Sequence, residues 1–248
     1  APQLMQSSVI IIAMYFCLSI FRYKDTVNTL QPLLQKLGIW FLHKAPNDHE
    51  LLRLAEAHNG WFTADSVKTA FKSIGESLGE DQISKWLLNY NLPDAIERDS
   101  GKRVGLILAG NLPLVGFHDI LCSVVTGHNV AIKASSVDIV LPKRVVHEIE
   151  KIEPKLKGRI TFVEGKLGEV DAVIATGSSN SMRYFDAYFG HLPHLFRAQR
   201  TGVAVLDGLE SEDELKALGD DIFTHFGLGC RSTTKVFLPR DFDLDRCF

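Results

Sequence analysis

The sequence lacks three features that would each have pointed to a class of protein. It has no Cys-x-x-Cys pair, which makes a structural zinc site a poor expectation. It has no strong charge excess, since the net charge is −3 over 248 residues, and this argues against nucleic acid or an anionic membrane surface as a partner. The chain is long enough to build its own core without disulfides. We therefore expect its four cysteines to be reduced and the protein to be cytoplasmic.

A transmembrane span is also missing from residues 1–25, although this segment is apolar. Val9 to Phe21 is interrupted only by Ser19, but it falls short of the roughly 20 residues that a membrane-spanning helix needs. It has the length of a signal-peptide core, yet no basic residue precedes it and no small-x-small cleavage site follows. A buried helix or a wrongly assigned start of the chain is the favoured interpretation. A membrane anchor or a secretory signal stays open, so membrane association is not decided.

The remaining chain changes character at Arg103. Apolar residues recur at helical spacing before that point, and short apolar runs alternate with helical segments after it. We predict a helical N-terminal region over residues 26–102 and an α/β region from residue 103 onward. The alternation predicts an α/β fold with a mostly parallel, Rossmann-like sheet and helices on both faces. The expected strands are 104–109, 129–133, 159–164, 171–175, 202–206 and 234–238. The expected helices are 30–41, 49–59, 63–74, 81–90, 115–126, 137–152, one that opens within 176–179 and runs to about 189, and 211–226.

We expect Ser135 or Ser136 to cap helix 137–152, and Ser211 to form a capping box with Glu214. Trp61 and Trp86 are expected to pack in the helical layer, and the polar residues 94–102 to form a linker.

Cys230 is the first candidate for chemistry. It follows Gly227-Leu228-Gly229, between a helical segment and a strand-like one. Glycines let the backbone turn sharply and approach a ligand, and N–H groups in such a turn can stabilise an oxyanion. Cys122 lies in an apolar helical segment, where a core role is expected.

Three further candidates follow predicted strands. Thr176-Gly177-Ser178 opens a helix, whose N-terminus suits a phosphate, although a plain turn with a serine cap is an equal alternative. Lys133 ends a buried strand and could contact a ribose or phosphate, or simply extend into solvent. Asn111 could donate to an oxyanion, or could serve only as a turn residue. Neither Gly-x-Gly-x-x-Gly after a strand nor a P-loop is present.

Four segments, in this order, resemble the aldehyde dehydrogenase superfamily, and within it the acyl-CoA reductases of the LuxC type. Gly110 to Leu114 is similar to an Asn-Phe-Pro-Leu segment, and Val130 to Ser135 to a Val-Val-Leu-Lys-Pro-Ser strand end. Ala175 to Ser178 is similar to Phe-Thr-Gly-Ser, and Gly227 to Cys230 to Gly-Gln-x-Cys. Two segments, Ala109 to Asp119 and Phe226 to Arg231, resemble the LuxC family in particular. The likeness spans roughly Thr26 to Phe248, and the superfamily's catalytic domain continues beyond its cysteine, so we expect the C-terminal part to be missing.

The resemblance implies an aldehyde dehydrogenase-like fold and a fatty acyl thioester reductase. It divides the α/β part of the chain into a nucleotide-binding region over residues 103–200 and the start of a catalytic domain over 201–248, after the helical region over 26–102. Cys230 would be the nucleophile and Asn111, with the Cys230 N–H, the oxyanion hole. Lys133, Thr176, Gly177 and Ser178 would bind NADPH, with NADH possible. Dinucleotide binding without the glycine fingerprint is normal in that superfamily. The substrate would be an acyl-CoA or acyl-carrier thioester, and a full-length protein would be a homo-oligomer.

The resemblance also contains one departure. Hydrolytic aldehyde dehydrogenases carry a glutamate in a Leu-Glu-Leu-Gly-Gly-Lys segment, and the loosely matching residues 195–200 have no carboxylate. Since such a glutamate would activate water, its absence favours discharge by hydride over hydrolysis.

Two rival functions stay open. One is a cysteine acyltransferase or hydrolase that pairs Cys230 with His225 or His118 and works without nicotinamide. The other is a non-catalytic truncated module that uses Val9 to Phe21 as an anchor.

Overall fold

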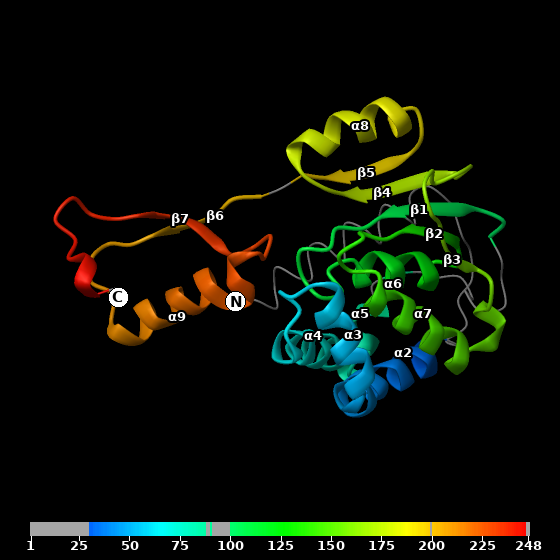
Figure 1. Ribbon diagram of the computed structural model, residues 1–248, viewed down its shortest axis with the longest axis horizontal. Coiled ribbons are helices and arrows are strands. Elements are labelled where there is room, and N and C mark those ends of the chain that lie inside the picture. Colours follow the sequence, from blue (N-terminus) through cyan, green and yellow to red (C-terminus); the bar gives the residue numbers. More distant parts are fainter. Residues whose placement is uncertain (1–29, 88–89, 91–99, 199, 247–248) are drawn as a thin grey trace. The chain divides into compact units, whose positions relative to one another are not determined.

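The computed structural model describes residues 30–87, 90, 100–198 and 200–246 (Figure 1). The apolar segment 1–25, most of the expected linker 94–102, Cys17 and Cys247 lie outside these residues. The chain divides into two compact units, and the boundary along the sequence lies between Arg197 and Ala198. Each unit is described by itself. The three-part domain division given above stays a prediction. Within the described ranges, no helix is both long and apolar enough to cross a membrane.

The first unit begins with a layer of helices. These are α2 (Leu30–Ile39), α3 (His49–His58), α4 (Ala64–Ser77) and α5 (Glu80–Leu87). Side-chain caps fix two of the starts, since Asp48 Oδ1 accepts from the Leu51 N–H at 3.0 Å and Thr63 Oγ1 from the Ser66 N–H at 3.2 Å. The expectation that both Trp61 and Trp86 pack in this layer is half right. Trp86 packs partly buried against the core, whereas the Trp61 side chain is 56% exposed.

A five-stranded parallel sheet follows, in the order β3-β2-β1-β4-β5. Its strands are β1 (Arg103–Ile107), β2 (Asn129–Lys133), β3 (Ile160–Phe162), β4 (Ala172–Thr176) and β5 (His194–Arg197). The chain starts at the central strand β1, moves outward through β2 and β3, and returns to the other side of β1 with β4 and β5. The strand order therefore reverses between β1 and β4, which is the topological switch point of a doubly wound fold.

Alternation along the strands explains why both faces of this sheet are covered. Val104 and Leu106 of β1 join the core cluster that includes α6 (Phe117–Val125), α7 (Val140–Ile152) and the N-terminal helices. Val173 and Ala175 of β4 belong to a smaller cluster on the opposite face, against which α8 (Ser179–Phe189) packs. Figure 1 shows α8 on one side of the sheet and α6 and α7 on the other. The predicted α/β fold with helices on both faces is confirmed.

Two local expectations in this unit are wrong. Neither Ser135 nor Ser136 caps the following helix, because residues 135–138 form a turn closed by the Asp138 N–H on the Ser135 carbonyl at 3.2 Å. Helix α7 begins only at Val140 and has no side-chain cap. Strand β5 was not expected at all. It is an edge strand whose residues are at most half-buried, so it lacks the apolar run of a central strand.

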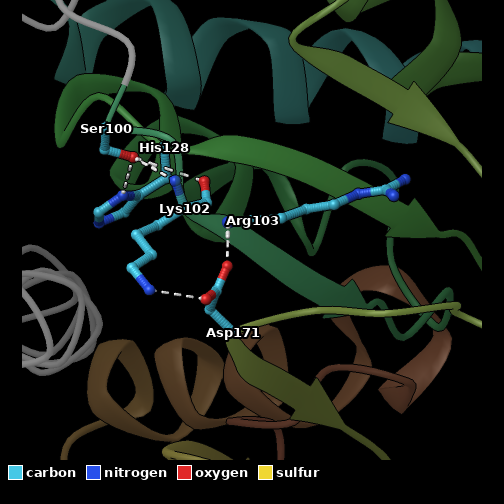
Figure 2. A network of polar contacts seen from close by, with 5 residues as sticks. All are labelled: Ser100, Lys102, Arg103, His128 and Asp171. Atoms are coloured by element: carbon cyan, nitrogen blue, oxygen red, sulfur yellow. Dashed lines mark hydrogen bonds and ion pairs between the residues drawn. The ribbon is translucent and has the colours of Figure 1, made fainter.

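The amino end of the sheet is closed by polar contacts (Figure 2). Asp171, just before β4, accepts from the Arg103 N–H at 2.8 Å and from Lys102 Nζ at 2.9 Å, which ties β4 to the start of β1. Burial alone would raise the pKa of Asp171, but these two donors lower it below its usual value. Ser100 Oγ lies 3.0 Å from His128 Nδ1 beside them.

The second unit contains β6 (Gly202–Val205), α9 (Glu212–Phe223) and β7 (Thr233–Phe237). The strand expected at 202–206 is present, but it pairs with β7 in a separate two-stranded parallel sheet. Ser211 caps α9 through the expected capping box with Glu214. Among the described hydrophobic residues of this unit, only Leu215 is buried.

Candidate functional site

The carboxyl edge of the five-stranded sheet gathers the residues that the sequence singled out in the first unit. Ile107 of β1 is in register with Lys133 of β2 on one side and with Ala175 of β4 on the other. Lys133 therefore ends beside the turn that carries Asn111, and Thr176 ends β4 across the switch point. Ligands of doubly wound folds bind at this edge, where the strand order reverses. The fold thus brings all five of these predicted positions, from 111 to 178, to one edge.

The start of α8 presents backbone N–H donors. Ser178 is its N-cap, with Oγ accepting from the Ser181 N–H at 3.3 Å, and the Ser178 side chain is exposed. A Cβ on Gly177 would come within 2.8 Å of the Ser181 Cβ, so a glycine is what lets the helix start this close to the strand. The unpaired N–H groups of such a helix start are suited to a phosphate.

Lys133 adds a cation to the same edge. Its side chain is exposed, whereas the preceding Ala131 and Ile132 are fully buried. An ammonium group and a helix N-terminus on one edge make a donor set that suits the pyrophosphate of a dinucleotide. The residues present therefore fit the cofactor that the sequence resemblance implies.

Asn111 lies half-buried in a turn that is fixed at both ends. Before it, a Cβ on Gly110 would approach the Ser135 Cβ to 2.7 Å, so the two turns touch. After it, Leu114 has a φ of 57° in the left-handed region, and its N–H donates to Asp138 Oδ2 at 2.9 Å.

Asp138 itself has no signal in the sequence, because a lone aspartate between Val137 and Ile139 belongs to no recognisable motif. The residue is only 4% exposed. Burial raises its pKa to about 7, and the hydrogen bond from the Leu114 N–H opposes that rise. Asp138 thus changes its charge near neutral pH.

Replacing Asp138 by asparagine is expected to change how stability depends on pH. From pH 3.8 upward the unfolded chain loses the Asp138 proton while the folded chain keeps it up to about pH 7, so the wild type loses stability as the pH rises through this window. The asparagine variant does not titrate at this position. We therefore expect its free energy of unfolding, relative to that of the wild type, to increase by about 2–3 kcal/mol from pH 5 to pH 8. Denaturant titrations at several pH values measure it.

Asp171→Asn is the matched control for this prediction. The pKa of Asp171 is lowered, so Asp171 is ionised in both the folded and the unfolded state throughout that range. The difference in free energy of unfolding between Asp171→Asn and the wild type should therefore not change with pH. A difference from the wild type that is also independent of pH for Asp138→Asn would contradict a raised pKa of Asp138 in the folded protein.

A buried ion pair joins β5 to α6 in the same unit. Arg197, the last residue of β5, donates to both carboxylate oxygens of Asp119 at 2.8 Å, and the two side chains are 16% and 5% exposed. No role for Asp119 is evident from the sequence. Arg197 lies in the segment that was loosely matched to the glutamate of hydrolytic relatives, and its charge there is positive.

Cys230 belongs to the second unit, where it lies in the turn between α9 and β7. The turn is closed by the Ser232 N–H on the Gly229 carbonyl at 3.0 Å, and the thiol is free and exposed. Cys122, in contrast, is fully buried in α6, as expected. Of the cysteines in the described part of the chain, Cys230 is therefore the one that solvent reaches.

The approach to this turn is strained. His225, Phe226 and Gly227 are consecutive left-handed residues, with φ values of 54°, 59° and 70°. For residues with a side chain this conformation costs about 1–2 kcal/mol each, and such strain concentrates at functional positions. Burial lowers the pKa of His225, so its imidazole is neutral near pH 7. Across the described residues there is no group of three or more side chains that could hold a metal ion.

Comparisons with known proteins agree with these features. Residues 45–245 match the family model described as acyl-CoA reductase (LuxC), and this range contains all the candidate site residues named above. A search of curated protein sequences gave no match.

Solved structures with a similar fold are aldehyde dehydrogenases and related enzymes. The NAD⁺ complex of the aldehyde dehydrogenase from Bacillus cereus has a TM-score of 0.59 at 17% identity, covering 93% of this chain and 51% of that one. A variant of the propionaldehyde dehydrogenase from a Clostridium phytofermentans fucose utilisation bacterial microcompartment has a TM-score of 0.61 at 12% identity, covering 97% and 57%. An oxidoreductase from Marinobacter aquaeolei has a TM-score of 0.60 at 15% identity, covering 94% and 52%.

At these identities the likeness establishes the fold, which is aldehyde dehydrogenase-like as expected. The chain spans about half the length of these structures. The family model covers most of the chain, and the chain belongs to the LuxC family of acyl-CoA reductases.

Proposed function

We propose that this chain carries the nucleophile and the cofactor-binding edge of a reductase that converts a fatty acyl thioester to an aldehyde. The observation that carries the proposal is an exposed, free Cys230 in a glycine-bounded turn of a LuxC-family chain. A cytoplasmic location, a homo-oligomeric full-length protein and an acyl-CoA or acyl-carrier substrate belong to the same proposal.

The first chemical step is transfer of the acyl group to sulfur. The Cys230 thiolate attacks the thioester carbonyl carbon, the bond from that carbon to the donor's sulfur breaks, and the donor leaves as a thiolate that takes up a proton. The Asn111 side-chain amide and the Cys230 N–H stabilise the oxyanion of the tetrahedral intermediate. The product is a thioacyl enzyme on Cys230.

Lys133 and the residues Thr176, Gly177 and Ser178 hold the phosphates and ribose of a nicotinamide cofactor. When bound, the cofactor, NADPH or NADH, supplies hydride to the acyl carbon. The solved Bacillus cereus relative is an NAD⁺ complex, which supports a nicotinamide cofactor without choosing between the two forms. Arg197 supports reduction over hydrolysis, because it leaves no carboxylate at the end of β5 to activate water.

The test is intact-protein mass spectrometry after incubation with a long-chain acyl-CoA in the absence of cofactor. We expect the wild type to gain the mass of one acyl group, and Cys230→Ala to gain none. Cys122→Ala is the matched control, because it removes a cysteine that is buried and should leave the adduct intact. Circular dichroism first establishes that each variant is folded.

Addition of NADPH or NADH then separates the functions. Discharge of the adduct as aldehyde supports the reductase. Loss of the adduct as free acid without nicotinamide would instead support a cysteine hydrolase, in which neutral His225 is available as a base. An adduct on Cys230→Ala, or none on folded wild type, would overturn the assignment of Cys230.

A further inference from the structure

The buried carboxylate of Asp138 lies directly behind the turn that carries Asn111. We infer that Asp138 is a positioning residue for Asn111, which it holds through the Leu114 N–H. The inference rests on the proposed function for the role of Asn111, and it adds a residue that neither the motifs nor the family match assigns.

The turn needs an external support because its backbone is strained. Leu114 is a branched residue in the left-handed region, with a φ of 57°, where a glycine would be the unstrained choice. A strained residue persists only where its surroundings over-determine it. Here the Leu114 side chain is 3% exposed, and its N–H is held by Asp138 Oδ2 at 2.9 Å.

Stability alone gives no reason for an aspartate at this position. The Asp138 Oδ1 is buried and has no hydrogen-bond partner among the described residues, and an unsatisfied buried polar atom is costly. An aspartate just before a helix ordinarily caps it, but α7 has no side-chain cap and the Asp138 oxygen bonds to the other turn. The carboxylate therefore serves the Asn111 turn and not its own helix.

The contacts bracket Asn111. Gly110 touches the Ser135 side chain on one side of it, and Leu114 bonds to Asp138 on the other. Both partners belong to the turn after β2, which starts just beyond Lys133. Asp138 thus links the turn of the proposed oxyanion donor to the turn of a proposed cofactor-binding residue.

The experiment compares three variants of Asp138 in the complete chain. Asp138→Asn keeps the shape and an acceptor oxygen. Asp138→Leu keeps the number and branching of heavy atoms without an acceptor, and Asp138→Ala removes both. Ser136→Ala, in the same turn and exposed, is the matched control. The readouts are NMR hydrogen exchange of the Leu114 amide, the chemical shift of the Asn111 side-chain amide, and the single-turnover rate of Cys230 acylation.

We expect Asp138→Leu and Asp138→Ala to speed exchange at Leu114 about tenfold or more, since they remove its acceptor, while the Val130 amide in β2 is unchanged. The acylation rate at saturating acyl-CoA should fall about 10- to 100-fold, as for a misplaced catalytic group, without a change in the half-saturating concentration. Asp138→Asn and Ser136→Ala should stay within about threefold of the wild type in both measurements.

Unchanged exchange at Leu114 in the two variants that lack an acceptor would overturn the inference. So would faster exchange with an unchanged acylation rate, if Asn111→Ala does slow acylation. If the wild type forms no acyl adduct, the proposed function fails. The chemical shift of the Asn111 side-chain amide then tests by itself whether Asp138 positions Asn111. A shift in Asp138→Leu that is absent in Asp138→Asn supports positioning, and no shift in either refutes it.

Discussion

Replacing Arg197 by methionine is expected to lower the free energy of unfolding of the first unit by about 3–5 kcal/mol. Arg197 forms a two-point ion pair with Asp119, and the Asp119 side chain is only 5% exposed. Methionine roughly preserves the buried stem of arginine but leaves the Asp119 carboxylate without its counter-charge in a site that water reaches poorly. Urea unfolding followed by circular dichroism measures the loss.

Two further variants separate the charge from the packing. Asp119→Leu combined with Arg197→Met removes both charges, so much of the lost stability should return. Lys102→Met breaks an ion pair of similar length, in which Lys102 Nζ lies 2.9 Å from Asp171 Oδ1. The side chains of this pair are 46% and 34% exposed. Because solvent screens it, that change should cost about 1 kcal/mol or less. Equal losses for Lys102→Met and Arg197→Met would contradict a special role for burial.

Replacing Asn111 by alanine is expected to slow the acylation of Cys230 about 10²- to 10³-fold, if the amide donates to the oxyanion as proposed. The donor acts on charge that develops only in the transition state, so the half-saturating concentration of acyl-CoA should change far less than the rate. Single-turnover mass spectrometry of the Cys230 adduct measures both quantities.

Asn47→Ala is a suitable control for this measurement, because Asn47 is an exposed asparagine of the helical layer whose side-chain amide donates locally, to the His43 carbonyl at 2.9 Å. It should acylate at the wild-type rate. A rate for Asn111→Ala within a few-fold of the wild type, in a folded protein, would mean that Asn111 is a turn residue only.

The sequence predicted the central parts of the fold well. Strands β1, β2 and β4 are buried on both faces and therefore appear as short apolar runs bounded by glycine or polar residues. The capping box at Ser211 is a local pattern and was predicted at the correct residue, and the expected opening of α8 within residues 176–179 contains the observed N-cap, Ser178. Short motifs in a fixed order singled out Cys230 and Asn111, whose roles stay predictions.

What the sequence did not predict depends on contacts between distant segments. Arg197 and Asp119 are 78 positions apart, and neither residue has a local pattern that suggests its partner. Asp138 looked like an ordinary loop residue because its importance comes from burial against another turn. The pairing of β6 with β7 was not predicted, because periodicity predicts a strand and not its neighbour.

The strand order also has a consequence for how the protein folds. Strand β1 pairs with β2, which follows it closely, and with β4, which lies more than twice as far along the chain. Pairing across the longer loop costs more chain entropy and is expected to follow the shorter closure. The turn of Asn111 and the end of Lys133 would then meet early, whereas Thr176 to Ser178 would join them only when β4 docks. A dinucleotide that contacts both sides of the switch point would bind only after the slower closure, and should therefore slow unfolding more than it speeds refolding.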